Sequence, residues 1–263
     1  MKIGFIGCGN MATAMISGIL KKELVPAENI YASAKSEKTM EKIRTELGIS
    51  GADNCTVASE ADVLILAVKP VYLEEVIREI RSAVKKDAIV VTLSPGKTLN
   101  WLEGIFESPV KLVRTMPNTP ALVGEAMTAL CPNGAVSPEE LQRVCTVFES
   151  FGKVQVVSEA MIDVVVGVSG SSPAYVFMFI EAMADAAVAD GMPRAQAYEF
   201  AAQSVLGSAK MVLETGMHPG ALKDMVCSPG GTTIEAVRVL EEKGLRSAVI
   251  EAQKACVKKA RGL

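Results

Sequence analysis

Residues 3–12 read IGFIGCGNMA, a short apolar run that passes into a glycine-rich turn and then into a helical pattern. The run 3–6 has the continuous hydrophobicity of a buried strand, and the pattern over 10–22 is helical. Gly7, Gly9 and Ala12 fit G-x-G-x-x-A, in which glycines permit a tight turn and close approach of a pyrophosphate to a helix start. The strand before and the helix after favour a dinucleotide site over a glycine turn without a ligand.

The pattern of residues 1–157 alternates short apolar runs with helical segments. Such alternation predicts a mostly parallel, doubly wound α/β sheet of the Rossmann type. The apolar runs are continuous rather than alternating, as expected for strands covered on both faces. Strands are expected at 3–6, 30–33, 62–68, 88–93, 110–115, 126–131 and 154–157. Helices are expected at 10–22, 36–47, 70–84 and from Ser137 to Gly152.

The pattern changes near residue 158, and no convincing strand follows. Long helical stretches rich in alanine and methionine are expected at 173–190, at 193–215 and from Thr232 to the C-terminus. We therefore expect a Rossmann domain over 1–157 and an all-helical domain over 158–263. The stretch 173–190 is apolar on nearly all sides, and such a helix must be buried all round. In a domain of this size that burial indicates contact with another subunit.

Composition excludes several classes of protein and partner. The 263 residues are 49% hydrophobic and 22% charged, and 27 basic against 30 acidic residues leave a net charge of −3. Neither side of Gln155 has a basic surplus, so nucleic acid is not an expected partner. The six cysteines form no C-x-x-C pair or cluster with the single histidine, so no metal site is expected. With no signal peptide and no apolar run long enough to span a bilayer, we expect a cytoplasmic chain with reduced thiols and no membrane association.

The stretch 32–36, at the end of the second expected strand, bears on the choice of cofactor. NAD-binding folds usually place an acidic residue there to bind the ribose 2′-hydroxyl, whereas this chain has Ser33 and Lys35. A hydroxyl and a cation suit a 2′-phosphate, which favours NADP(H). The alternative is that Lys35 is an ordinary solvated lysine. Lys69, at the carboxyl end of the strand 62–68, either lines the same cleft or is a surface lysine.

The segment 228–235 has glycines that lead into a helix, followed by two threonines. Backbone N–H groups at such a helix start bind anions, for example a substrate carboxylate. Thr232 and Glu235 also fit a capping box, so an ordinary capped helix is the alternative. The loop 116–120 offers Asn118 or Thr119 to a nicotinamide, or is a rigid structural turn. In 167–173, Ser171 takes the last glycine position of G-x-S-x-G, and His218 is the only histidine, which argues against a serine hydrolase.

Taken together, these segments resemble the Δ1-pyrroline-5-carboxylate reductase family over essentially the whole chain. The matching parts are the GFIGCGNMA turn, 67–70, 116–120, 167–175 and 218–233, in the family's order. The most specific is DMVCSPGGTT at 224–233, which is close to the family signature.

The resemblance implies an oxidoreductase of the CH–NH class that completes proline synthesis. It reduces the cyclic imine to L-proline with hydride from NADP(H), or alternatively NAD(H). It also implies helical domains that interlock into a homodimer, with dimers assembling into a decamer in some members. The segment after the second strand varies among relatives, so the resemblance does not decide the cofactor.

The family pattern assigns roles residue by residue. Thr233 is the catalytic residue, its hydroxyl placed at the ring nitrogen, and the substrate carboxylate takes N–H bonds at the helix start. The residues implied for the substrate are Gly230, Gly231, Thr232 and Thr233. The residues implied for the cofactor are Gly7, Gly9, Asn10, Met11, Ser33, Lys35, Asn54, Ala67, Lys69 and Pro70.

Three competing interpretations remain. A β-hydroxyacid dehydrogenase also pairs a Rossmann with a helical domain, but neither Lys210 nor Lys223 lies in its G-x-x-x-N-x-x-K motif. A dinucleotide-binding protein with a dead site would not need the anion site at 228–233. A reductase of a six-membered cyclic imine acid is the nearest rival, and the sequence does not separate it from the five-membered case.

Overall fold

The computed structural model describes residues 1–93 and 96–262. Within these residues the chain forms two compact units, one made of Met1–Ser171 with Cys256–Leu263, the other of Ser172–Ala255. The first unit contains an eight-stranded sheet in the order β3-β2-β1-β4-β5-β6-β7-β8. The strands are β1 (Ile3–Ile6), β2 (Ile30–Ser33), β3 (Ser50–Gly51), β4 (Val63–Leu66), β5 (Ile89–Thr92), β6 (Lys111–Met116), β7 (Ala126–Pro132) and β8 (Gly152–Val156).

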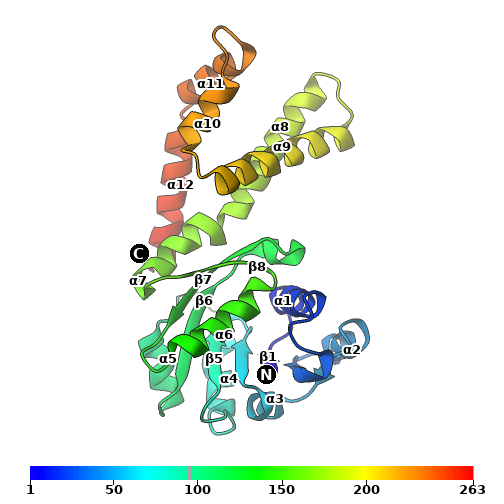
Figure 1. Cartoon of the computed structure of the whole chain (residues 1–263), viewed down its shortest axis with the longest axis vertical. Coiled ribbons are helices and arrows are strands. Elements are labelled where there is room, and N and C mark those ends of the chain that lie inside the picture. The colour runs from blue at the N-terminus through cyan, green and yellow to red at the C-terminus, as the bar shows by residue number, and fades with distance from the viewer. Residues whose placement is uncertain (94–95, 263) are drawn as a thin grey trace. The chain divides into compact units, whose positions relative to one another are not determined.

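All neighbouring strands are parallel except β6 and β7, which are antiparallel. The doubly wound, mostly parallel sheet is therefore confirmed. Helices flank the sheet in Figure 1. They are α1 (Asn10–Lys21), α2 (Glu37–Glu46), α3 (Asn54–Glu60), α4 (Leu73–Ile80), α5 (Leu99–Phe106) and α6 (Pro138–Glu149), with short 3-10 turns η1 (Ala27–Asn29), η2 (Pro70–Tyr72) and η3 (Thr119–Val123).

The strands β1, β4 and β5 at the centre of the sheet are buried on both faces, which explains their unbroken hydrophobicity. Ile3 and Phe5 of β1 join one apolar cluster with α1, α2 and α6. Ile6 belongs to a second cluster with α3, α4 and α5. Successive side chains of a strand point to opposite faces, so both layers draw their core from the same short runs. The parallel strands end at one edge of the sheet, which is where ligands bind in such folds.

Three short helices of this unit, α3, α5 and α7 (Glu159–Val165), and the short strand β3 were not predicted. Helix α3 begins after Asp53, whose carboxylate accepts from the Thr56 N–H at 2.9 Å, and it spans only Asn54–Glu60. Helix α5 begins after Thr98, whose hydroxyl accepts from the Trp101 N–H at 3.1 Å. Segments of about two turns show too few repeats for periodicity to reveal them. The caps were the signal that could have found them.

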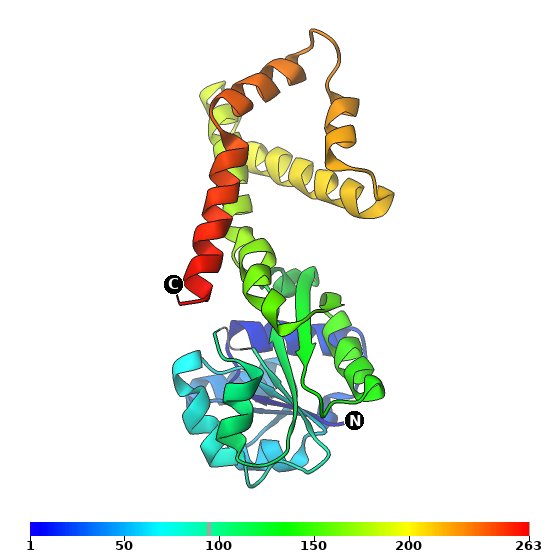
Figure 2. The same cartoon turned by 90° about the vertical axis from the view of Figure 1, so that its left-hand side faces the viewer.

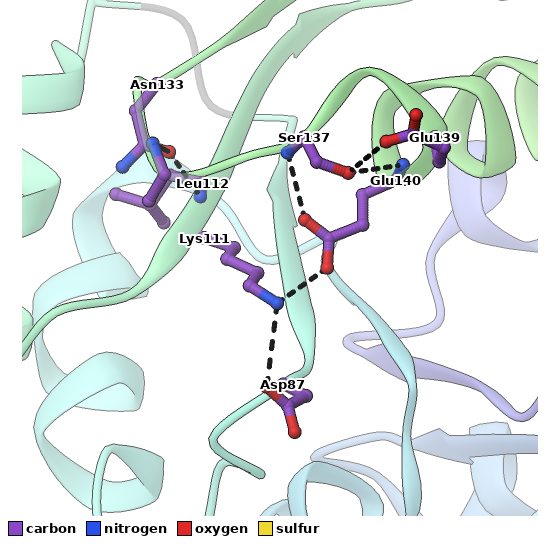
Figure 3. Close-up of polar contacts among 8 residues, drawn as sticks. Asp87, Lys111, Leu112, Asn133, Ser137, Glu139 and Glu140 are labelled. Carbon is purple, nitrogen blue, oxygen red and sulfur yellow. Dashed lines mark hydrogen bonds and ion pairs between the residues drawn. The ribbon is translucent and has the colours of Figure 1, made fainter.

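The helix expected from Ser137 is confirmed as α6, with Ser137 as its N-cap residue. Ser137 accepts from the Glu140 N–H, while Glu140 accepts from the Ser137 N–H at 3.0 Å, which completes a capping box. Lys111 at the start of β6 donates to the same Glu140 carboxylate at 2.6 Å and pairs with Asp87 at 3.6 Å (Figure 3). The Lys111 hydrogen bond lowers the pKa of Glu140. This cluster ties a helix start to the beginning of β6, at the edge opposite the ligand-binding end.

Helix α7 (Glu159–Val165) is attached to the sheet of the first unit by a buried cation. Arg114 of β6 is 3% exposed and pairs with Glu159 at 3.1 Å and with Asp163 at 3.5 Å. Ile162 of α7 packs against Ala129 and the strand β7. This packing explains why the compact unit extends to Ser171, whereas the sequence predicts a domain boundary between residues 157 and 158.

The second unit is all helical, as predicted. Helices α8 (Ser172–Ala189) and α9 (Arg194–Thr215) pack against each other. They are followed by α10 (Pro219–Val226), α11 (Thr232–Glu242) and α12 (Leu245–Ala260). The single helix predicted from Thr232 to the C-terminus is therefore wrong: Gly244 adopts a φ of +74° and separates α11 from α12. Figure 2 shows α9, α10 and α11 as separate rods joined by loops.

A π-helical segment, η4 (Val166–Gly170), joins α7 to α8. The serine- and glycine-rich segment 167–173 therefore contains a change of helix type between α7 and α8. As a result Glu159–Ala189 forms one helical stretch that is long and apolar enough, by length and composition only, to cross a membrane, so the expectation that no apolar run reaches that length is wrong. Only 11% of its most apolar window is buried in the single chain. In a single chain, Phe177 and Met178 are 63% and 68% exposed.

Candidate functional site

A pocket of about 590 Å³ opens in the first unit, at the carboxyl ends of β1, β2 and β4. Strands, the turns after them and helix α4 all contribute to its wall. Its lining includes six of the residues expected from the sequence to bind a cofactor: Gly7, Gly9, Ser33, Lys35, Asn54 and Lys69. The structure thus brings together segments that are far apart in the chain.

The glycine turn adopts a conformation that requires glycine at its first position. Gly7 has a φ of +89°, and a Cβ there would lie 2.9 Å from the carbonyl oxygen of Ala67. The Gly7 N–H donates to the carbonyl of Ser33 at 3.1 Å, which holds the turn across the ends of β1 and β2.

Gly9 precedes α1 and meets the requirement for close approach by a phosphate. It is the N-cap residue, and no side-chain hydrogen bond caps this helix. A Cβ at Gly9 would have no heavy atom within 4 Å, so the space above the helix start is open. Uncapped N–H groups facing open space form an anion-binding arrangement, and the residues present therefore fit a pyrophosphate.

Ser33, Asn54 and Glu79 form a hydrogen-bonded chain along the pocket wall. The Ser33 hydroxyl donates to Asn54 Oδ1 at 2.6 Å, and Asn54 Nδ2 donates to Glu79 Oε2 at 2.8 Å. Ser33 is buried, with 4% of its surface exposed. Asn54 thus occupies the junction between the end of β2 and helix α4.

The pocket carries charges of both signs. Lys35 lies over the Tyr72 ring, 5.3 Å from its centroid, and Lys69 is a second lysine of the lining. Opposite charges come from Asp53, Glu75 and Glu79. Hydrogen bonds from Thr56 lower the pKa of Asp53, and burial raises the pKa of the Cys8 thiol. None of these three acids was predicted from the sequence; the spacing of Glu75 and Glu79 on α4, one helical turn apart, was the available signal.

Four other expected cofactor residues lie beside the pocket without lining it. Asn10 and Met11 are the first two residues of α1. The Ala67 N–H donates to the Ile6 carbonyl at 2.8 Å, and Pro70 begins η2.

The segment 228–233 of the second unit forms a glycine-rich turn before α11. Gly230 has a φ of +67°, and a Cβ at Gly231 would lie 2.4 Å from Ser228 Oγ. Gly231 is the N-cap residue, Thr232 and Thr233 follow it, and no side chain caps the helix. The capping-box interpretation is therefore wrong: Glu235 instead receives hydrogen bonds from Arg238. The helix start keeps free N–H groups, and Thr233 offers a half-buried hydroxyl beside them.

Two other residues singled out in the sequence have structural roles. Asn118 donates to the Ser169 carbonyl at 3.0 Å and accepts from the Met127 N–H at 2.9 Å, so its amide is engaged within the protein. His218 caps α10, its Nδ1 accepting from the Gly220 N–H at 3.0 Å. Over residues 1–93 and 96–262, no group of three or more His, Cys, Asp or Glu side chains is placed to hold a metal ion.

Comparison with known proteins finds a family match for each of the two parts of the chain that contain these sites. Residues 159–263 match the pyrroline-5-carboxylate reductase dimerisation domain, and residues 2–96 match the family described as NADP oxidoreductase, coenzyme F420-dependent. The pyrroline-5-carboxylate reductase of Escherichia coli is 56% identical over all of this chain and 98% of its own. That of Methanosarcina acetivorans is 44% identical over 95% of this chain and 93% of its own.

The chain belongs to the pyrroline-5-carboxylate reductase family.

Solved structures of the family superpose over the whole chain. The reductase of Coxiella burnetii has a TM-score of 0.93 at 34% identity, covering 99% of this chain and 97% of its own. The Plasmodium falciparum reductase, solved with NADP bound, has a TM-score of 0.90 at 30% identity and covers 100% and 97%. A 3-hydroxyisobutyrate dehydrogenase from Mycobacterium tuberculosis is 14% identical with a TM-score of 0.52, so the runner-up family shares only the fold.

Proposed function

We propose that the chain is an NAD(P)H-dependent reductase of Δ1-pyrroline-5-carboxylate and makes L-proline in the final step of proline biosynthesis. One observation carries the proposal: this member of the reductase family has two helix starts that are suited to bind anions. One is the Gly7–Gly9 turn before α1, and the other is the Gly231–Thr233 turn before α11. A carboxylate-bearing substrate and a dinucleotide each need one such anchor.

The cofactor is NADP(H), with NAD(H) as an alternative. A relative solved with NADP bound supports this choice, as does the position of Lys35 on the pocket wall. The pyrophosphate would be held by Gly7, Gly9, Asn10 and Met11. The adenosine end would lie near Ser33, Lys35 and Asn54, and the nicotinamide side near Ala67, Lys69 and Pro70. When bound, the nicotinamide supplies hydride to the C=N carbon of the imine.

The substrate is anchored at the second unit. Its carboxylate would take hydrogen bonds from the N–H groups of Gly231 and Thr232, because a helix start favours negative charge. In this chain the Gly231 N–H donates to the Ser228 carbonyl at 3.1 Å, a bond that the carboxylate would replace. Thr233 orients the ring nitrogen with its hydroxyl. Among the described residues of this turn there is no histidine or acid to act as proton donor, so the imine arrives already protonated as an iminium.

Replacing Thr233 with valine tests its role, because valine keeps the shape and removes the hydroxyl. We expect kcat/KM for the imine to fall by about tenfold to a hundredfold, the cost of one or two hydrogen bonds to a charged group. NADPH affinity, measured by fluorescence titration, should stay within about twofold. Thr146→Val, in which an exposed helical hydroxyl bonded to the Gln142 carbonyl is lost, is the matched control. Unchanged kcat/KM for Thr233→Val would remove Thr233 from catalysis.

The helical residues 158–263 are proposed as the substrate-binding and dimerisation domain, and residues 1–157 as the dinucleotide-binding domain. Exposed apolar side chains on α8 and α9, such as Phe177, Met178 and Phe200, support an interlocked homodimer. The resemblance to the family extends this proposal to a decamer built from such dimers. The assembly is cytoplasmic and binds neither nucleic acid nor membrane.

Light scattering tests the assembly. We expect a mass of at least twice the 27.8 kDa of one chain at low micromolar concentration, because a monomer would expose too much apolar surface to remain soluble. A mass of one chain under those conditions would contradict the dimer. Recovery of the protein only with detergent or vesicles would instead assign the apolar stretch Glu159–Ala189 to a membrane.

The experiment that tests the function is the initial rate of NADPH and NADH oxidation with Δ1-pyrroline-5-carboxylate, beside the six-membered imine acid. Faster turnover of the five-membered ring supports the proposal. Faster turnover of the six-membered ring would assign the chain to the rival reductase activity. Binding of NADPH without turnover of either imine would favour a dinucleotide-binding protein with a dead site.

A further inference from the structure

We propose that Glu79 is a specificity-determining residue for the cofactor, and that it acts through Asn54 and Ser33 to favour a free ribose 2′-hydroxyl over a 2′-phosphate. This inference rests on the proposed function for its cofactor class. It concerns an acid that the sequence motifs do not contain and that lies on α4, between the strands of the fingerprint region and β5.

The direction of the hydrogen-bonded chain follows from its carboxylate end. An ionised carboxylate only accepts hydrogen bonds, so the Asn54 amide must turn its NH₂ group toward Glu79 Oε2, 2.8 Å away. Asn54 Oδ1 then faces Ser33, and the Ser33 hydroxyl must donate to it across 2.6 Å. Glu79 thereby sets the orientation of a hydroxyl that it does not touch.

A Ser33 hydroxyl that donates its single O–H to Asn54 can offer the pocket only its lone pairs, as a hydrogen-bond acceptor. A ribose 2′-hydroxyl can donate to such an acceptor, whereas a 2′-phosphate dianion also only accepts and gains nothing from it. Many NAD-binding folds place an acid at the end of the second strand for the same hydroxyl. Here Ser33 stands at that strand end, and the carboxylate reaches it through Asn54.

Lys35 has the opposite effect on the same wall. Its ammonium lies over the Tyr72 ring, and Lys35 lines the same pocket two residues after Ser33. Because the ammonium is positively charged, it attracts a phosphate. Lys35 therefore favours NADPH, Glu79 favours NADH, and the pocket accepts both cofactors. Glu79 limits the ratio of the affinity for NADPH to that for NADH.

Glu79→Gln removes the charge and also permits the chain to reverse. A glutamine amide can donate to Asn54 Oδ1, after which the flipped Asn54 donates to Ser33 and frees the serine proton for a phosphate. The probes are 2′,5′-ADP and 5′-AMP, titrated calorimetrically into the full chain with no imine present. We expect the ratio of their affinities to shift toward 2′,5′-ADP by about tenfold, as for one hydrogen bond to a charged group.

Glu75→Gln is the matched control. Glu75 lies on the same helix and lines the same pocket, and among the described residues its carboxylate forms no hydrogen bond or ion pair. Its substitution removes the same charge without touching the chain, so we expect a shift in the ratio of less than about twofold. Equal shifts for both variants would overturn the role of the chain, as would an unchanged ratio for Glu79→Gln.

Turnover provides an independent readout of specificity. For Glu79→Gln, the ratio of KM values for NADH and NADPH should move in the same direction as the fragment affinities, while kcat moves less. A loss of kcat with both cofactors and no change in the KM ratio would indicate a merely structural role and contradict the inference. If the wild-type chain binds both fragments but turns over no imine, the reductase proposal fails while this inference stands. If it binds neither fragment, the inference fails with the cofactor assignment.

Discussion

Gly9→Asp is expected to lower the affinity for NADPH at least about a hundredfold while leaving the fold intact or slightly more stable. Its Cβ enters open space, because a Cβ at Gly9 has no heavy atom within 4 Å. The new carboxylate caps α1 and occupies the N–H groups that a pyrophosphate needs, and its charge repels the phosphates. Aspartate is a better N-cap residue than glycine, so the stability of the free protein should rise by a few tenths of a kcal/mol.

Opposite effects on binding and stability distinguish this result from simple misfolding. The measurements are fluorescence titration with NADPH and thermal unfolding without ligand. Gly104→Asp is the matched control, since Gly104 is an exposed glycine of α5 that also has open space around its Cβ and lies outside the pocket lining. An NADPH affinity unchanged by Gly9→Asp would place the cofactor away from this turn.

Arg114→Met should lower the free energy of unfolding by about 2–3 kcal/mol, the largest stability effect that we expect from one charged residue in this chain. Methionine retains much of the volume but leaves Glu159 and Asp163 without their cation. The value lies below the full penalty for breaking a buried pair, because the two carboxylates are 35% and 26% exposed and regain some hydration. Glu159 also still accepts from the Leu99 N–H at 2.7 Å.

Thermal unfolding of the assembled protein measures this effect. Arg78→Met is the control: Arg78 also pairs with two acids, Glu74 and Glu107, but is half exposed, and we expect a loss of less than about 1 kcal/mol. Equal losses for the two variants would mean that burial of Arg114 adds nothing to its ion pairs. Because Arg114 attaches α7 to β6, Arg114→Met should also make proteolytic cleavage near residues 159–171 faster.

Local features of the chain predicted most of the secondary structure. The strand of 3–6, the turn at Gly7–Gly9 and the capping box at Ser137 all depend on residues within a few positions of each other. The helix break at Gly244 was missed because an isolated glycine within a helical pattern is often tolerated. The capping box assigned to Thr232 was wrong because it requires Thr232 to be the N-cap residue. In the structure the N-cap residue is Gly231, one position earlier, and Thr232 is already the first residue of α11.

Some parts of the candidate site were predicted and others were not. The parts that were missed depend on contacts between residues far apart in the sequence. The glycine turns could be identified because backbone conformation is encoded locally, and Asn54 entered only through family resemblance. Glu79 and Asp53 were missed, since the one available signal, the spacing of Glu75 and Glu79 one helical turn apart, does not by itself mark a pocket. Asn118 was offered to a nicotinamide, yet its amide bonds Ser169 and Met127, partners that a linear pattern cannot show.

By itself, the sequence determined the class of fold, the two helix starts suited to anions and the family, because strand runs, glycine turns and signature residues are properties of short segments. Only the tertiary structure decided which side chains meet. It joined Glu79 to Asn54 across 25 residues of the chain and Asn54 to Ser33 across 21. It also paired Arg114 with Glu159 of α7 across 45 residues. The physical reason is that periodicity sets the direction of a side chain within its own element, whereas its partner depends on how elements pack across the sheet.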